Sequence, residues 1–149
     1  LIKTLNSIAQ GTISAEKQDD DLACYASKIT KQEATIDWQR PAAELAWQIR
    51  AFNPFPVCHS QIDGKQIRIW SAQATTNSIS RKPPGTIVAV TGKALEIACG
   101  EQNLVVTEVQ LPGKKRMNVA DILRGNPQLF TAGSRFGGPH NQPSNESDQ

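Results

Sequence analysis

The spacing of apolar residues changes near the middle of the chain. Over 1–10 and 41–52 apolar side chains recur every three or four residues, whereas over 66–74 they alternate with polar ones. The change falls at Asn53-Pro54-Phe55-Pro56, where Pro54 disfavours helical geometry at the residue before it. The pattern predicts helices and a linker before this corner and strands after it.

The corner also carries two aromatic residues, Phe52 and Phe55. Aromatic side chains at helical spacing usually belong to the core, and both are expected to hold the preceding helix across the end of a sheet. A packed helix exit is therefore the favoured interpretation, and a ligand site is the alternative.

The first ten residues predict an amphipathic helix, and Gly11 follows where a glycine commonly ends one. No neighbouring segment is suited to cover the apolar face of 1–10. We interpret this segment as the last helix of a domain that is absent here. The chain begins with Leu1 rather than Met, and we expect that processing or truncation has removed sequence upstream.

Residues 11–37 are mostly polar, with an acidic run at 19–21, and predict a linker. A cation site at the acidic run is the alternative, but three consecutive carboxylates of an extended chain cannot all face one ion. Thr30 and Glu33 have the spacing of a capping box, which predicts a short helix that ends near Ile36.

Beyond the corner the pattern predicts five short strands and one short helix. Asp63-Gly64 is a tight hairpin signal, and the helix is expected from Asn118 as N-cap to Gly125. Leu129, Phe130 and Phe136 are expected to pack back onto the strands. The strands are expected at 57–62, 66–74, 85–91, 95–99 and 103–110.

These elements predict a mainly β fold with short helices. Five short strands contain too few residues for two full sheets, so 38–136 is expected to form a small OB-like Greek-key barrel. The barrel is preceded by the N-terminal helix and the linker. Gly, Pro, Asn, Ser and Gln dominate 137–149, where we expect a disordered tail.

Composition fits one domain with attachments. The chain has 149 residues and 38% hydrophobic residues, enough for one core of moderate size. No apolar run approaches the roughly 18 residues of a membrane helix, and there is no signal-peptide pattern. The three cysteines are widely spaced without a CxxC motif, and we expect reduced, mostly buried thiols in a cytoplasmic protein.

The net charge of +2 is unevenly distributed along the chain. Residues 1–37 carry four Lys against six acidic residues, 38–136 carry twelve Lys and Arg against six acidic residues, and 137–149 add two acidic residues. The resulting charges are −2, +6 and −2. The positive barrel suits a binder of the phosphate backbone, and an ordinary soluble surface is the alternative.

No catalytic constellation emerges from the sequence. It contains no metal-ligand cluster, no glycine-rich phosphate loop and no GxSxG motif. Cys58 and His59 are adjacent, so in a strand their side chains point to opposite faces and cannot form a thiolate and imidazole pair. The chain is therefore not expected to be catalytic by itself, nor to bind a metal or cofactor.

The strongest candidate for function is the basic loop Lys114-Lys115-Arg116, which follows Pro112-Gly113 and leads into a predicted helix. The alternative is an ordinary solvated surface loop without a binding role. Backbone NH groups at a helix start favour phosphate, and OB-type barrels commonly bind oligonucleotides. Other positive charges of the barrel that could join this loop are Arg50, Arg81, Lys82, Arg124 and Arg135.

Seven short segments of the chain form a recognisable series: 25–29, 36–38, 49–56, 69–70, 84–87, 98–100 and 110–121. Two of them contain Asn53-Pro54-Phe55-Pro56 and Gly113-Lys114-Lys115. In their order and spacing these segments resemble the C-terminal half of the methionyl-tRNA formyltransferase family. The resemblance covers nearly all of 1–136.

The resemblance implies transfer of a formyl group from 10-formyltetrahydrofolate to the amino group of methionine on initiator tRNA. The catalytic residues and the folate pocket of that family lie in a Rossmann-like N-terminal domain, which has no counterpart here. Residues 1–10 match the end of that domain, 11–37 its linker and 38–136 the barrel that holds tRNA. The implied partners of a monomeric protein are initiator methionyl-tRNA and the catalytic domain in cis, with no membrane.

The same resemblance implies the residues that contact nucleic acid. Lys28 and Lys31 match basic linker positions near the tRNA 3′ end, and Lys114 and Lys115 match the family's barrel loop. Combined with the positive charges of the barrel, the expected nucleic-acid contacts are Lys28, Lys31, Arg50, Arg81, Lys82, Lys114, Lys115 and Arg116.

Two other functions stay open at this point. The chain could be the C-terminal domain of a sibling formyltransferase that acts on a nucleotide sugar, or of a folate-dependent dehydrogenase, which gives the basic loop no RNA role. It could also be a non-enzymatic OB-like module for protein contacts, whose binding is insensitive to salt. Upstream sequence and RNA affinity distinguish these alternatives.

Overall fold

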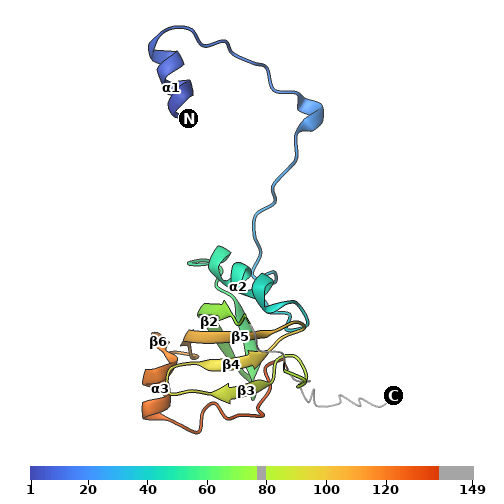
Figure 1. Cartoon of the computed structure of the whole chain (residues 1–149), viewed down its shortest axis with the longest axis vertical. Helices are drawn as coiled ribbons and strands as arrows, with labels where there is room; N and C mark the ends of the chain where they lie inside the picture. The colour runs from blue at the N-terminus through green and yellow to red at the C-terminus, as the bar shows by residue number, and fades with distance from the viewer. Residues whose placement is uncertain (77–79, 138–149) are drawn as a thin grey trace, which may run out of the picture.

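The structure of the chain is a computed structural model, which describes residues 1–76 and 80–137. An N-terminal helix, α1 (Ile2–Ala9), is joined by an extended linker to a small β domain (Figure 1). Gly11 follows α1 with a φ of 66°, as expected of a glycine that ends a helix. No residue of α1 is buried. The predicted helix and the extended course of the linker are confirmed, apart from a 3-10 turn at Asp20–Leu22.

The β domain is a curled half-barrel of antiparallel strands, which confirms the predicted fold class. The strand order is β1-β2-β5-β4-β3, so the long connection after β2 makes a Greek-key crossover, and a short strand β6 pairs with β5. The strands are β1 (His59–Ile62), β2 (Lys65–Ala74), β3 (Ile87–Val90), β4 (Leu95–Ala98), β5 (Asn103–Gln110) and β6 (Arg116–Asn118).

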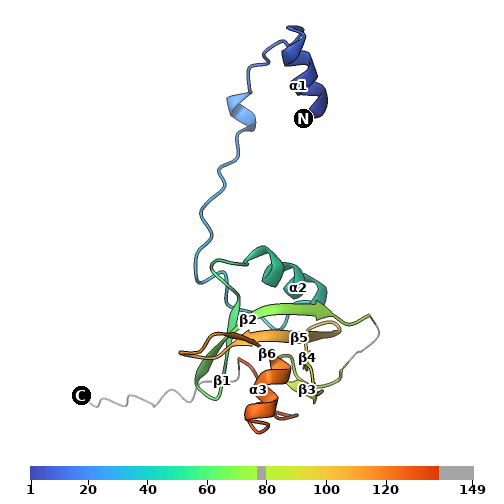
Figure 2. The same cartoon turned by 90° about the vertical axis from the view of Figure 1, so that its left-hand side faces the viewer.

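Two helices lie on different sides of this barrel (Figures 1 and 2). Helix α2 (Ala42–Ala51) packs over β2 and β5, with Pro41 as its N-cap. Helix α3 (Val119–Gly125) has the predicted N-cap, Asn118, and packs against β5 and β6. The residues of α2 that face the strands, including Leu45 and Ile49, are fully buried.

The segment 133–137 bridges the opening of the half-barrel. Ser134 O accepts a hydrogen bond from Ile87 N of β3 at 2.8 Å, and Gly137 N donates to Gln61 O of β1 at 2.8 Å. Some of the polar backbone groups on the two edges of the sheet therefore find partners in this segment. This segment also carries Phe136 into the core.

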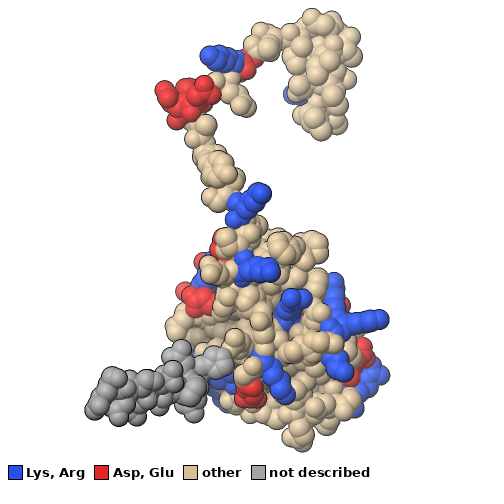
Figure 3. Space-filling model, turned by 180° about the vertical axis from the view of Figure 1, so that it is seen from behind, with Lys and Arg blue, Asp and Glu red and all other residues tan. Residues whose placement is uncertain are grey.

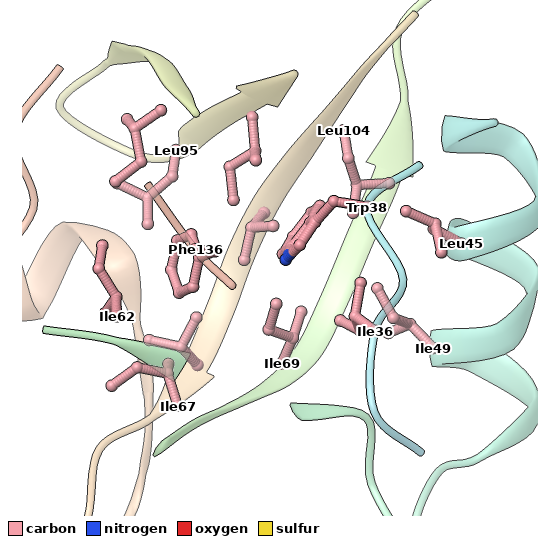
Figure 4. Close-up of a cluster of buried hydrophobic side chains, with 14 of the residues drawn as sticks. Ile36, Trp38, Leu45, Ile49, Ile62, Ile67, Ile69, Leu95, Leu104 and Phe136 are labelled. Carbon is pink, nitrogen blue, oxygen red and sulfur yellow. The ribbon is translucent and has the colours of Figure 1, made fainter. Parts of the chain in front are cut away.

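The core fills the interior of the barrel and the space under α2 (Figure 4). Trp38 lies near its centre, with its ring centroid 5.6 Å from that of Phe136. Its Nε1 donates a hydrogen bond of 2.9 Å to Ser60 Oγ, so its polar atom is satisfied although the ring is buried. Phe130 and Phe136 are both 1% exposed, and Leu129 packs against the cluster, as the sequence predicts.

The predicted capping box forms, but the helix after it does not. Thr30 N donates to Glu33 Oε1 at 3.1 Å, and Glu33 N donates to Thr30 Oγ1 at 3.4 Å. Only a turn follows, because Ile36 N donates to His59 O and His59 N donates to Ala34 O, each at 2.9 Å. The pairing with β1 extends the chain, and the expectation of a helix ending near Ile36 is wrong.

Two further expectations need correction. Phe52 packs partly against the core, but Phe55 is 69% exposed and does not help to hold α2 on the sheet. The basic loop was expected to run directly into a helix, whereas Arg116–Asn118 pairs with β5 as strand β6. The tail predicted to be disordered lies, after Gly137, outside the described residues.

Candidate nucleic-acid interface

The turn between β5 and β6 presents Lys114 and Lys115 to solvent. Lys114 N donates to Leu111 O at 3.1 Å, and Gly113 adopts a φ of 68°, which permits the reversal of the chain. Gln110 Nε2 donates to Lys114 O at 2.9 Å. The two lysines therefore stand on a turn that is tied to its own strand, and neither forms an ion pair within the part of the chain that the structure describes.

Arg116 differs from these two lysines because it already has partners. Its Nε donates to Glu108 Oε2 at 3.0 Å, and its guanidinium lies 5.0 Å from the centroid of the Trp70 ring. Trp70 Nε1 in turn donates to Gln110 Oε1 at 3.2 Å. The ion pair with Glu108 offsets the charge of Arg116, so the geometry suits a role in anchoring β6.

A groove of about 570 Å³ lies between the linker, the 54–56 corner and the outer face of β1 and β2. We call it the Phe55 groove. None of its described lining residues is acidic. The lining residues used below are Lys31, Phe55, His59, Gln66, Arg68 and Trp70.

A second hollow, of about 210 Å³, continues this surface toward the basic turn. It shares Gln66 and Arg68 with the Phe55 groove and is otherwise lined by Gln110 and 111–113. The hollowed surface thus runs from Lys31 in the linker to the turn that carries the two lysines. Figure 3 shows Lys and Arg side chains at the base of the linker and over the barrel, with several acidic side chains among them.

Lys28 and Arg50 are close in sequence to the linker end of this surface, but neither is among the lining residues of the two hollows. Lys28 is exposed and precedes Lys31 by three residues. Arg50 is exposed in the last turn of α2, close in sequence to Asn53, whose Nδ2 donates to Trp70 O at 2.7 Å. This hydrogen bond places the end of α2 beside the strand that forms the floor of the groove.

Arg81 and Lys82 are exposed, but they lie at the other end of the barrel. Ala74 at the end of β2 pairs with Leu104, while Arg68 pairs with Gln110, six residues along β5. The connection that contains Arg81 and Lys82 therefore leaves the sheet at the far end from the β5–β6 turn. The structure does not bring these two cations together with Lys114 and Lys115.

The cysteines and His59 form no catalytic arrangement in the described part of the chain. Burial raises the pKa of the Cys58 thiol to about 11 and that of Cys99 to about 12, so both stay protonated at neutral pH. His59 Nε2 lies 3.3 Å from Thr35 Oγ1 rather than beside a thiol. Cys24 is exposed. Among the described residues there is no cluster of three His, Cys, Asp or Glu suited to a metal.

Arg68, Trp70 and Phe55 were not predicted from the sequence as nucleic-acid contacts, although all three line the Phe55 groove. Along 66–74, Ile67 and Ile69 alternate with Arg68 and Trp70, which puts Arg68 and Trp70 on one face of a strand. Nothing local showed that Lys31 and Phe55 would stand beside them. Helical spacing assigned Phe55 to the core, whereas the corner turns it outward. Only the pairing of Thr35 with His59 brings the linker to this face.

A family model described as the formyl transferase C-terminal domain matches residues 28–127. The chain therefore belongs to the family of formyl transferase C-terminal domains. It is 42% identical over 137 residues to the methionyl-tRNA formyltransferase of Pseudomonas putida strain GB-1, and 41% identical to that of Pseudomonas fluorescens strain Pf-5. The aligned part is 92% of this chain and 43% and 42% of those proteins, so the chain spans less than half the length of these relatives.

A solved structure supports the fold independently. A variant of HypX from Aquifex aeolicus superimposes with a TM-score of 0.64 over 88% of this chain and 23% of that protein. The sequence identity is 15%, so the likeness bears on the fold alone. Within the described residues, none of the helices is both long and apolar enough to span a bilayer.

Proposed function

We propose that this chain is the tRNA-holding part of a methionyl-tRNA formyltransferase. The observation that carries the proposal is the hollowed, acid-free surface that connects Lys31 of the linker with the Lys114 and Lys115 turn. Relatives of 41–42% identity carry the name of an enzyme that acts on methionyl-tRNA. The full protein would transfer a formyl group to initiator methionyl-tRNA in the cytoplasm.

The role of this chain in that reaction is positional. Lysine ammonium groups on a fixed turn neutralise phosphates and hold an RNA in register without reading its sequence. Lys28, Lys31 and Arg50 serve the end of the surface that lies next to the linker. Contacts at both ends would restrict how the RNA rotates, which raises the fraction of time that its aminoacyl end spends in a productive position.

The chemistry itself belongs to a part of the protein outside this chain. The described residues bring together no acid–base pair or activated nucleophile, and both buried thiols remain protonated. We infer that 10-formyltetrahydrofolate is the co-substrate of the full enzyme and is bound by its catalytic domain. The exposed apolar residues of α1, among them Ile2, Leu5 and Ile8, suit packing against that domain.

The proposal is tested by fluorescence anisotropy of labelled initiator tRNA with this chain at about 50 and 200 mM salt. The expected result is binding that weakens steeply with salt. Reversing the charges in Lys114→Glu/Lys115→Glu should lower the affinity by at least tenfold and flatten the salt dependence, because two phosphate contacts are lost.

The matched control is Arg81→Glu/Lys82→Glu, which makes the same change in net charge at the other end of the barrel. A markedly smaller loss in this variant would localise the contact to the β5–β6 turn. Equal losses in the two variants would mean that net charge alone governs binding. Absence of tRNA binding at low salt would instead favour a formyltransferase with a nucleotide-sugar substrate, a folate-dependent dehydrogenase or a module for protein contacts.

A further inference from the structure

Phe55 is a large aromatic residue that the core does not use. Its side chain is 69% exposed, although it belongs to the β domain, between α2 and β1, rather than to the linker. Pro54 and Pro56 flank it and restrict the backbone on both sides. The corner is also tied down, since Val57 N donates to Phe52 O at 3.1 Å. Phe55 is therefore an exposed ring on a rigid support.

The surroundings of this ring are cationic and polar. Lys31 and Arg68 line the same groove, together with Gln66 and His59, and no acidic side chain is among its described lining residues. The volume of about 570 Å³ lies within the range of small-molecule sites. An apolar ring beside two cations is the combination that a nucleotide requires, namely a stacking surface and partners for phosphate.

The second aromatic side chain of the groove is already engaged. Arg116 lies over the ring of Trp70, and the Nε1 of Trp70 donates to Gln110. Phe55 has neither a stacking partner nor a buried environment in the described part of the chain. It is consequently the ring of this groove that can accept a new stacking partner.

We propose that the Phe55 groove binds one unpaired nucleotide of the RNA, with its base stacked on Phe55 and its flanking phosphates near Lys31 and Arg68. The inference rests on the proposed function, because it assigns a subsite on the same RNA-holding surface. A base within a duplex is covered by its neighbours and offers no open face. The groove thus distinguishes an unpaired end or loop from a helix, which lysines that contact phosphates cannot do.

A second exposed aromatic residue, Trp47, has different surroundings from Phe55. Trp47 on α2 is 59% exposed and lines a different hollow, which contains Glu33 and Glu44. Arg40 in that hollow is paired with Glu44 at 2.8 Å, so its charge is already matched. Carboxylates beside the ring repel phosphate, and Trp47 is therefore the matched control for an exposed aromatic residue outside the proposed subsite.

The test compares two labelled RNA hairpins, each titrated with the 149-residue chain in an anisotropy assay. Both are closed by the same non-nucleotide tether in place of a loop, and they differ only in a short unpaired 3′ end. In Phe55→Ala the affinity for the hairpin with the unpaired end should fall roughly five- to one-hundred-fold, the range for loss of one base stack. Affinity for the blunt hairpin and the salt dependence should not change. Phe55→Trp should retain binding, whereas Phe55→Leu should lose it as Phe55→Ala does, because it keeps apolar area but no ring.

Four results would overturn the inference. If Phe55→Ala bound each hairpin as tightly as the unaltered protein does, the subsite would be disproved. Salt-sensitive binding would in that case still support the proposed function. Retained binding by Phe55→Leu, or an equal loss in Trp47→Ala, would replace stacking with a general apolar contact. Failure of the unaltered protein to bind either hairpin at low salt would overturn the proposed function together with the subsite.

Discussion

Gly100 shows how tightly the backbone is packed where the segment before α2 meets the sheet. Its N–H donates to Trp38 O at 3.0 Å and to Arg40 O at 3.1 Å. A Cβ built on Gly100 would lie 1.8 Å from Gln39 O, a backbone atom that cannot move without disturbing both hydrogen bonds. The glycine is required by this close approach rather than by an unusual φ.

We therefore predict that Gly100→Ala lowers the free energy of unfolding by about 3 kcal/mol or more, because the added methyl group displaces backbone. Gly92→Ala is the control, since a Cβ there meets no atom within 4 Å. Its effect should stay within about 0.5 kcal/mol. Urea denaturation measures both, and similar values for the two variants would contradict the packing argument.

At the scale of elements, β6 is the piece that holds the basic turn in place. It pairs with β5 over only three residues, and its first residue, Arg116, bonds to Glu108 and covers the Trp70 ring. The strand was not foreseen because three residues carry too little periodicity to distinguish a strand from a loop. The charge of Arg116 looks like part of the binding loop in sequence, but the structure uses it within the sheet.

We predict that Arg116→Ala lowers the free energy of unfolding by about 1 kcal/mol, from the combined loss of a partly exposed ion pair and a cation–π contact. Arg124→Ala is the control. Arg124 forms an ion pair with Asp121 but is 78% exposed. Its removal should cost no more than about 0.5 kcal/mol.

A tRNA titration of Arg116→Ala beside Lys115→Ala separates anchoring from binding. Arg116→Ala should reduce affinity less than Lys115→Ala, because the Arg116 charge is already offset by Glu108. A larger loss at Arg116 would show that the guanidinium leaves Glu108 to contact the RNA.

For the whole molecule, the end of the described chain completes the barrel. The 133–137 segment hydrogen-bonds to both β3 and β1, and Phe136 from this segment contacts Trp38 and Phe130 in the core. The two edges of the sheet are therefore joined by a segment that is not itself a strand. Closure and core packing depend on the same few residues.

We predict that Phe136→Ala lowers the free energy of unfolding by about 3–5 kcal/mol, the range for a buried aromatic side chain. Phe55→Ala removes the same atoms from a 69% exposed site and should change stability by no more than about 0.5 kcal/mol. Thermal or urea unfolding tests this contrast. A cost at Phe55 that matched the cost at Phe136 would mean that the corner is part of the core.

The elements of the barrel were largely predictable from local pattern. Strand β5 has the predicted bounds, the hairpin turn falls at Asp63-Gly64 with φ of 48° and 72°, and Asn118 is the N-cap of α3. Each of these signals depends on residues close together in sequence. The errors arose where a distant partner changed the outcome, as at Thr30 and Glu33, whose capping box forms but is followed by pairing with β1 rather than by a helix.

The candidate surface was predictable only in part. The sequence by itself determined that the barrel is basic, that Lys114 and Lys115 stand on a turn and that Arg68 and Trp70 share a strand face, because charge and alternation are local properties. Tertiary structure decided which of these charges meet. The bridge between Thr35 and His59 carries Lys31 to the outer face of β1, while the strand register places Arg81 and Lys82 at the far end. Such contacts join residues far apart in the chain, and their free energy depends on the packing of the whole barrel.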